Sequence, residues 1–237
     1  QSLSQGASLP APLPWQYHDY IGYNLQQQAR LEADNLNYWQ QELANLPEPL
    51  QLTPGQDRPL QFDGAGDTLY LDIESALLSE LQQVASRQGC TLFVLLYAAY
   101  ALTLHKLSGQ DDIVIGVPVA GRDLPEIADV PGVFMRVLPV RAPYQSEMSF
   151  GDYLAAIQQQ FAGAVAHQDF AFEHLVEAVK APRSASRQPL FDTMFALHDA
   201  MSWQSESQGI SAQEIHIAQR QVKADIVVDA YRNGGSL

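Results

Sequence analysis

The chain has 237 residues, of which 46% are hydrophobic and 17% are charged, a composition typical of a folded globular protein and not of a disordered chain. Its formal net charge of −14 argues against nonspecific binding to nucleic acid or to an anionic membrane surface, because both also carry negative charge. The longest apolar run, residues 92–104, is shorter than the roughly 20 residues of a membrane-spanning helix, and no signal peptide is visible, so we expect a cytoplasmic protein.

The first long element is a helix. Residues 1–14 are small, polar and proline-rich, and we interpret them as a linker. Residues 15–46 predict a long helix, because apolar side chains recur every three or four residues and Pro47 and Pro49 end the pattern. The apolar stripe consists of Leu36, Trp39, Leu43 and Leu46.

A polar loop leads to a strand and two more helices. The strand is expected over residues 69–73, where apolar and more polar side chains alternate. Ser75 is the expected N-cap of the next helix, which Gly89 closes. Thr91 is the expected N-cap of a helix that runs to Ser108. This helix is apolar on nearly every face, so we expect it to be buried.

The second half of the chain alternates strands with helices. Strands are predicted over residues 112–119 and 133–141, and helices over residues 150–166, which Ser149 caps, and 172–180. Three further strands are predicted over residues 190–198, 215–220 and 225–231. We therefore expect an α/β fold of the two-layer α+β kind, a mixed sheet covered by helices.

Two details of the sequence concern its end and its cysteine. Asn233-Gly234 directly after a predicted strand is a strong hairpin signal, yet three residues follow it, so we expect a piece of a longer domain that stops before its last strands. The single cysteine, Cys90, cannot form a disulfide within the chain. We interpret it as a small buried side chain and not as a nucleophile.

Three short segments combine polar and apolar residues in unusual patterns. Residues 115–122 read as a strand that runs into a Gly-Arg turn, residues 167–173 as a polar cluster between two helices, and residues 186–192 as the entry to a strand. Each segment alone has an ordinary structural interpretation. Their order along the chain adds a functional interpretation to the structural one.

Together these segments resemble the condensation domains of nonribosomal peptide synthetases. Residues 108–122 (SGQDDIVIGVPVAGR) closely resemble a segment of these domains. Four further core motifs of that family, the fourth to the seventh, resemble residues 17–20, 132–141, 167–173 and 183–192 in the same order. The resemblance extends over essentially the whole chain.

The resemblance implies a fold and a place within it. Condensation domains are similar to chloramphenicol acetyltransferase, with two related lobes that form a V around a tunnel and a catalytic histidine between them. Residues 15–237 would be the C-terminal lobe. The family's His-His-x-x-x-Asp-Gly motif is absent, since no two histidines are adjacent in the sequence. We therefore expect no catalytic residue in this chain and no activity from it alone.

The resemblance also implies chemistry and partners. In the family, the amine of one carrier-bound aminoacyl group attacks the thioester of another, and a peptide bond forms. The expected partners are the N-terminal lobe, the upstream and downstream peptidyl carrier proteins and an adjacent adenylation domain. Substrates would arrive on the 4′-phosphopantetheine arms of the carrier proteins, with no cofactor bound directly. Histidines and carboxylates are dispersed along the sequence, so no metal site is expected.

The motifs supply candidates for tunnel lining or for contact with the other lobe. They are Tyr17, Asp19, Arg122, Phe134, Arg136, His167, Asp169 and Arg187. For each of them a structural role, as a helix cap, an ion pair or a core side chain, is the competing interpretation.

Two places depart from the family pattern. The fourth motif usually continues to Trp-Gln, where this chain has Tyr23-Asn24, and the fifth usually has asparagine where this chain has Arg136. Arginine adds bulk and a fixed charge, so we expect Arg136 to bias the substrate range.

Two other functions fit the same fold. One is a noncatalytic condensation-like module that docks carrier proteins or recruits a partner enzyme. The other is a standalone acyltransferase of the wider superfamily, which the match to five carrier-linked motifs makes the weaker alternative. The sequence upstream of Gln1 separates the condensation enzyme from the noncatalytic module, because an intact histidine motif favours the enzyme and a damaged one favours the module.

Overall fold

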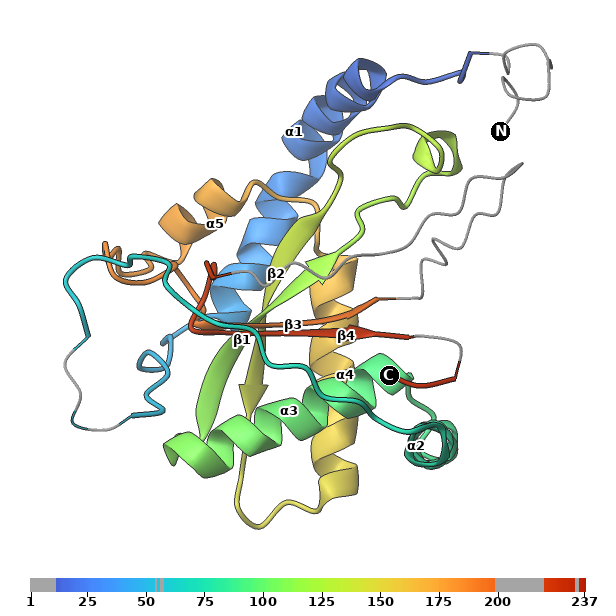
Figure 1. Ribbon diagram of the computed structural model, residues 1–237. Helices are drawn as coiled ribbons and strands as arrows, with labels where there is room; N and C mark the ends of the chain where they lie inside the picture. Colours follow the sequence, from blue (N-terminus) through green and yellow to red (C-terminus); the bar gives the residue numbers. More distant parts are fainter. Residues whose placement is uncertain (1–11, 54, 56–57, 199–219, 233–234) are drawn as a thin grey trace.

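The computed structural model describes residues 12–53, 55, 58–198, 220–232 and 235–237 (Figure 1). Its elements in chain order are α1 (Tyr17–Glu42), α2 (Ser75–Arg87), α3 (Leu92–Ser108), β1 (Asp112–Val119), the 3-10 helix η2 (Pro125–Ile127), β2 (Arg136–Pro143), α4 (Phe150–Ala166), α5 (Phe172–Ala178), β3 (Thr193–His198) and β4 (Ile226–Tyr231).

The described strands form one mixed sheet in the order β2-β1-β3-β4. β1 pairs with β2 in antiparallel fashion, from Asp112 opposite Pro143 to Val119 opposite Arg136, and β1–β3 and β3–β4 are parallel pairs. α3 packs on β1 and α4 packs on β2, and the two helices contact each other. The predicted α/β class with a mixed sheet and covering helices is confirmed.

Local sequence signals explain the central helices. The Thr91 hydroxyl accepts a hydrogen bond from the Val94 amide at 3.2 Å, and Gly109 ends α3 with a φ of 71°. Ser149 caps α4 by accepting from the Asp152 amide at 3.2 Å. The predicted burial of α3 is confirmed, because both ends of the helix and its middle contribute buried side chains.

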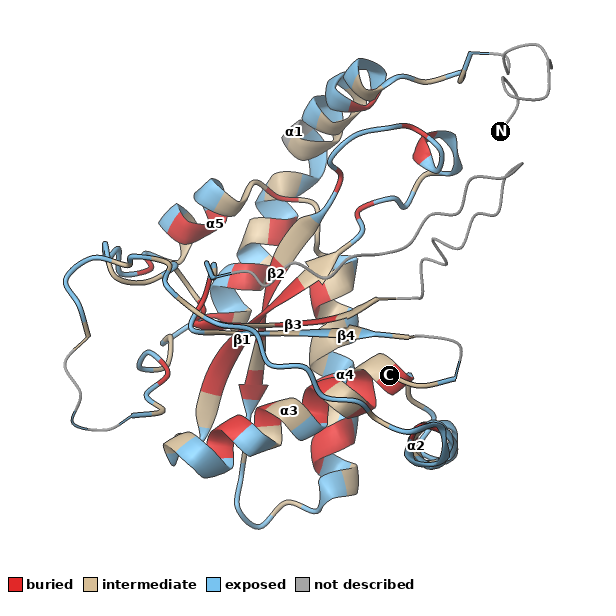
Figure 2. Ribbon diagram, in the orientation of Figure 1, coloured by how far each residue is buried: buried red, intermediate tan, exposed pale blue. Residues whose placement is uncertain are grey.

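Most of the buried apolar side chains belong to one of two separate clusters. The main core lies where α3, α4, β1 and β2 meet, and Trp39 and Leu43 bring the end of α1 into it (Figure 2). The second, which we call the satellite cluster, consists of Tyr20, Ile127, Val130 and Phe134, with Leu13, Trp15, Tyr17 and Leu124 packed against it. The N-terminal half of α1 carries this satellite cluster beyond the sheet (Figure 1).

The predicted strand over residues 69–73 is wrong. Leu69 and Leu71 are 89% and 90% exposed, and this segment forms no strand. Ile73 exchanges backbone hydrogen bonds with Leu237, at N–O distances of 2.7 and 3.1 Å. Alternation describes a half-buried strand, but a strand also needs a neighbour along its whole length, which the local pattern does not report.

Several element ends also differ from expectation. Glu74 and not Ser75 is the N-cap of α2, and α1 stops at Glu42 because the chain turns at Asn45, whose φ is 52°. β2 begins at Arg136, three residues after its predicted start, and β3 begins at Thr193. The predicted strand over residues 215–220 and the hairpin turn at 233–234 fall, except for residue 220, outside the described residues.

Cys90 is only partly buried, although it packs against the main core. Desolvation raises the pKa of its thiol, which lowers its reactivity as a nucleophile.

No single described helix is long and apolar enough to cross a membrane. By length and composition only, α2 and α3 taken together would be, but they form a bent pair with an angle of 101° between them.

Candidate functional site

Arg122 organises the loop between β1 and β2. Its guanidinium donates hydrogen bonds to backbone carbonyls of that loop, those of Ile127 at 2.6 Å, Ala128 at 3.3 Å, Val130 at 2.9 Å and Gly132 at 3.3 Å. The guanidinium carbon also lies 4.1 Å from the centroid of the Phe134 ring. These contacts give Arg122 a structural role within the loop.

Gly121 explains why a glycine precedes this arginine. Its φ is 63°, and a Cβ at this position would lie 2.1 Å from the carbonyl oxygen of Phe134. The backbone of the turn can approach Phe134 so closely only without a side chain. The Gly-Arg pair of the motif thus builds one turn, with the glycine giving the approach and the arginine satisfying the carbonyls.

The start of α1 packs on the same loop. The rings of Tyr17 and Tyr20 meet the Phe134 ring edge to face, with centroid distances of 5.2 and 4.6 Å, and the Tyr17 hydroxyl donates to the carbonyl of Val133 at 2.8 Å. Asp19 closes a capping box by accepting from the Gln16 amide at 2.9 Å. Tyr17, Asp19, Arg122 and Phe134 therefore lie together, in or beside the satellite cluster.

Arg136 links this region to the junction between α4 and α5. One guanidinium nitrogen lies 2.6 Å from Asp169 Oδ1, and another donates to Tyr20 Oη and Asn24 Oδ1, both at 3.2 Å. The Arg136 side chain is 17% exposed and that of Asp169 40%. These three partners of Arg136 come from two places, α1 and the α4–α5 junction.

The α4–α5 junction is held mainly through its backbone. Trp39 Nε1 donates to the carbonyl of His167 at 2.8 Å, and Asn35 Nδ2 donates to the carbonyl of Asp169 at 2.8 Å. His167 is the C-cap of α4, and its Nδ1 lies 2.9 Å from the carbonyl oxygen of Gly163. The second half of α1 therefore fixes the path of the junction, and His167 contributes to the end of a helix.

Arg187 lies apart from the other candidates. It pairs with Asp192 at 2.8 Å, and Asp192 also accepts from the amide of Leu50 at 2.9 Å and lies 3.9 Å from Arg58. Arg58 bonds to Asp225 in addition. Burial lowers the pKa of Arg58, with a further contribution from the positive charge of Arg187. Asp192 ends the seventh-motif segment but was not among the candidate site residues, although it is buried at 8% exposure and lies at the centre of this ion cluster.

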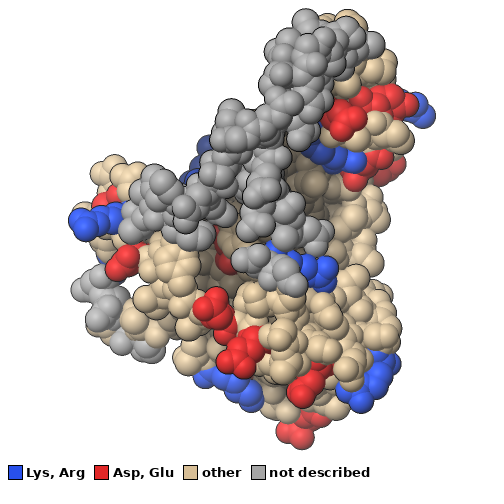
Figure 3. All heavy atoms as spheres, turned by 45° about the vertical axis from the view of Figure 1, so that its right-hand side comes forward, with Lys and Arg blue, Asp and Glu red and all other residues tan. Residues whose placement is uncertain are grey.

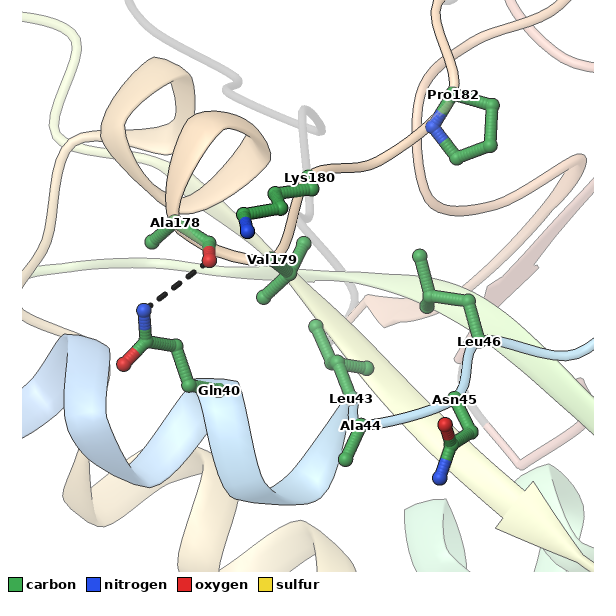
Figure 4. A pocket seen from close by; sticks show the side chains of 9 residues that line it. All are labelled: Gln40, Leu43, Ala44, Asn45, Leu46, Ala178, Val179, Lys180 and Pro182. Atoms are coloured by element: carbon green, nitrogen blue, oxygen red, sulfur yellow. Dashed lines mark hydrogen bonds between the residues drawn. The ribbon is translucent and has the colours of Figure 1, made fainter.

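Two hollows open on the described surface. One, of about 470 Å³, lies between the end of α1 and the end of α5, where Gln40 donates to the carbonyl of Ala178 at 3.1 Å (Figure 4). Leu43, Leu46, Val179 and Lys180 are among the side chains that line it. The other, of about 400 Å³, is lined by Phe172, Glu173, Val176, Arg183, Ser184, Arg187 and Pro189. Of the predicted site residues, only Arg187 reaches either hollow.

The surface charge is mixed. On the face shown in Figure 3, basic and acidic side chains are interspersed over the described part of the surface. In the part of the chain that the structure describes, no three His, Cys, Asp or Glu side chains are grouped so that they could hold a metal ion.

Comparison with known proteins gives the family. The condensation domain family model matches residues 1–237. The chain is 35% identical over 229 residues to tyrocidine synthase 3 of Brevibacillus parabrevis, and 35% identical over 233 residues to bacitracin synthase 1 of Bacillus licheniformis. These matches cover 96% and 97% of the chain but 4% of each relative, so the chain spans a small part of the proteins that it resembles.

Solved structures show the same fold. The complex of the X-domain and OxyB from teicoplanin biosynthesis aligns with a TM-score of 0.82 at 23% identity, covering 98% of this chain and 52% of that one. The condensation domain of the monacolin K polyketide synthase MokA aligns with a TM-score of 0.79 at 21% identity, covering 97% of this chain and 55% of that one. The resemblance drawn from the motifs is confirmed: the chain belongs to the condensation domain family of nonribosomal peptide synthetases.

Proposed function

We propose that the chain is the C-terminal lobe of a condensation domain that joins two carrier-bound aminoacyl or peptidyl thioesters by a peptide bond. One observation carries the proposal. The fold aligns over 97% of the chain with about half, 55%, of the condensation domain from the monacolin K polyketide synthase MokA. The sequence of the chain also lacks adjacent histidines, which fits a lobe whose catalytic motif belongs to the other half.

The chemistry divides between the two lobes in this account. The histidine motif of the N-terminal lobe positions or deprotonates the attacking amine, and polar groups stabilise the oxyanion that forms as the thioester carbonyl is attacked. The amine nitrogen forms the new C–N bond, and the carrier thiol leaves. The chain described here supplies one wall and the floor of the tunnel and makes no peptide bond alone.

Substrates and partners follow from the same proposal. Both acyl groups arrive on 4′-phosphopantetheine arms, one from an upstream and one from a downstream peptidyl carrier protein, and an adjacent adenylation domain loads a carrier. The residues proposed to face the tunnel or the N-terminal lobe are Tyr17, Asp19, Arg122, Phe134, Arg136, His167, Asp169 and Arg187. Arg187 lies away from the rest, and we assign it to the lobe contact.

Exposed apolar side chains near the fifth motif support a contact with another lobe. Val133 and Met135 are 74% and 58% exposed, although both flank the buried Phe134. Large apolar side chains gathered at a motif are typical of a surface that another protein segment covers. We place the N-terminal lobe over them.

Binding between the two lobes tests this proposal. A separately produced N-terminal lobe with an intact histidine motif should bind the chain in equal proportion in analytical ultracentrifugation. Met135→Glu should weaken that binding by on the order of tenfold, because it places a charge in an apolar contact. Leu107→Glu, at a position that is 66% exposed at the end of α3, is the matched control and should leave binding unchanged. Absence of any binding would contradict the lobe assignment.

A further inference from the structure

α1 connects two parts of the molecule that are buried separately. Tyr20, near its start, belongs to the satellite cluster, and Trp39, near its end, belongs to the main core. None of the described side chains over residues 21–34 is buried. The middle of the helix therefore connects the two clusters but contributes no buried side chain that would pack one cluster against the other.

Buried apolar contacts thus do not fix the satellite cluster to the main core along this helix. In the described part of the chain, two polar contacts join the α4–α5 junction to the β1–β2 loop or to β2, the strand that follows it. Gln168 donates to Asp123 at 3.1 Å on the exposed surface, and Arg136 pairs with Asp169 at 2.6 Å. The second contact joins two charged groups and is better buried, whereas only one partner of the first is charged and that contact is exposed, so the second is the stronger of the two.

Arg136 is itself fixed on the satellite side. Tyr20 and Asn24, which accept its hydrogen bonds, are four residues apart and therefore lie on one face of α1. A guanidinium can bond to these two acceptors and to a carboxylate at once, because its donors form a planar fork. Its position at the first residue of β2 places it directly after the loop that Arg122 folds.

Asp169 is fixed on the other side independently of Arg136. Asn35 holds the carbonyl of Asp169, and Trp39 holds the neighbouring carbonyl of His167, so the second half of α1 and the main core determine where the carboxylate stands. The Arg136–Asp169 pair therefore joins two bodies, each of which is anchored by other contacts.

We infer that Arg136 is a positioning residue that sets the place of the satellite cluster relative to the α4–α5 junction. Asn24 shares this role, and Asn24 and Arg136, two of the positions that depart from the family pattern, are in direct contact. The inference rests on the proposed function for its consequence: both bodies carry motifs assigned to the tunnel, so the pair sets the distance between two parts of its wall. Arg136 then influences substrates through the shape of the tunnel and without touching them.

Hydrogen exchange on the 237-residue chain, followed by mass spectrometry, tests the structural part. Arg136→Gln and Asp169→Asn should each accelerate exchange in residues 16–24 and 122–134 by roughly two- to fivefold, the range that a partly exposed ion pair supports. The double variant should exchange no faster than either single variant, because both remove one contact. Arg136→Lys, which keeps a charge opposite Asp169 but lacks the planar fork that also reaches Tyr20 and Asn24, should restore only part of the protection.

The control variant is Arg183→Gln. The Arg183 side chain is 71% exposed and its partner Glu177 is 68% exposed, so its loss should leave exchange unchanged in the satellite cluster. Unchanged exchange in Arg136→Gln, additive effects in the double variant, or equal acceleration in α3 and β1 would each overturn the inference. The last result would mean that Arg136 stabilises the whole fold and does not position one part of it.

A second measurement separates positioning from substrate contact. In a complete condensation domain that carries the chain, Asp169→Asn should change the relative rates with different acyl substrates in the same direction as Arg136→Gln. A shift with Arg136→Gln alone would show direct contact with substrate and overturn the inference. A domain that forms no peptide bond would count against the proposed function. Hydrogen exchange does not depend on turnover, so it would still test whether Arg136 positions the satellite cluster.

Discussion

The ring of His167 is stacked on the ring of Tyr38, with their centroids 3.9 Å apart and their planes 6° apart. The stack lies directly beside Gly163 of α4, where an added Cβ would come within 2.4 Å of the Tyr38 hydroxyl oxygen. A histidine that the sequence marks as a possible tunnel residue is therefore part of the contact between α1 and the end of α4.

This stack predicts a pH dependence. Burial, with the nearby charge of Glu42, raises the pKa of Tyr38 to about 12. Since the folded pKa lies above the ordinary value near 10, the fold favours the neutral phenol, and this contribution to stability is complete below pH ~10 and is lost as the pH rises towards 12.

Absorbance at 295 nm checks this pH dependence. The difference between the titration curves of the chain and of Tyr38→Phe should show one phenol that ionises near the raised pKa of about 12, and Glu42→Gln should move it lower. A difference curve centred near the ordinary tyrosine pKa of about 10 would contradict the burial of this ring.

The turn at Gly121 predicts a large effect from one methyl group. Gly121→Ala must keep a φ of 63° and bring a Cβ against the backbone of Phe134, so we expect a loss of about 1–3 kcal/mol in the free energy of unfolding. Gly22→Ala is the matched control, because Gly22 lies in α1 with nothing within 4 Å, and it should stabilise the chain by about 0.5–1 kcal/mol. Urea unfolding measures both. Equal effects would show that the Gly-Arg turn is not constrained.

The ion cluster around Asp192 predicts that a residue outside the candidate site controls stability. Asp192→Asn leaves Arg58 and Arg187 without their shared carboxylate, so we expect a loss of about 3 kcal/mol, at the lower end of the range for broken buried pairs. These arginines are 25% and 22% exposed, which moderates the loss. In the same unfolding measurement, Glu177→Gln, which breaks an exposed pair, should cost no more than about 0.5 kcal/mol. An equally small effect of Asp192→Asn would show that water replaces the pair.

The edge of the sheet predicts self-association. β4 is the last strand in the described sheet, and its Val227 side chain is 38% exposed. An edge strand can pair with another chain, and the net charge of −14 opposes this at low salt, so association should increase with ionic strength. Light scattering should show that Val227→Lys reduces association at high salt and that Leu107→Lys, at an exposed position of α3, does not. A strict monomer at every salt concentration would contradict this prediction.

The sequence predicted what depends on neighbouring residues. Thr91 and Gly109 bound α3, and Ser149 caps α4, because a cap and an apolar pattern act within one or two turns. The strand over residues 69–73 failed for the opposite reason, since its pairing depends on residues distant in the sequence.

The candidate site shows the same division. The motifs identified Arg122, Arg136 and Asp169, but not that Arg136 joins Asp169 to Asn24 across more than 100 residues, with a separation of 112 between Arg136 and Asn24. The seventh motif ends at Asp192 and contains its partner Arg187, but the contacts of Asp192 with Arg58 and Leu50 have no local signal, because those residues come from distant segments. Side chains that act by joining remote segments are recognised only when the fold brings those segments together.

Peptide-bond formation tests the central claim most directly. The chain alone, mixed with two loaded carrier proteins, should give no dipeptidyl product above the uncatalysed control in mass spectrometry. The same chain joined to an N-terminal lobe with an intact His-His-x-x-x-Asp-Gly motif should give product, and replacing the second histidine of that motif by alanine should abolish it. Turnover by the chain alone, or none from the joined lobes, would contradict the account.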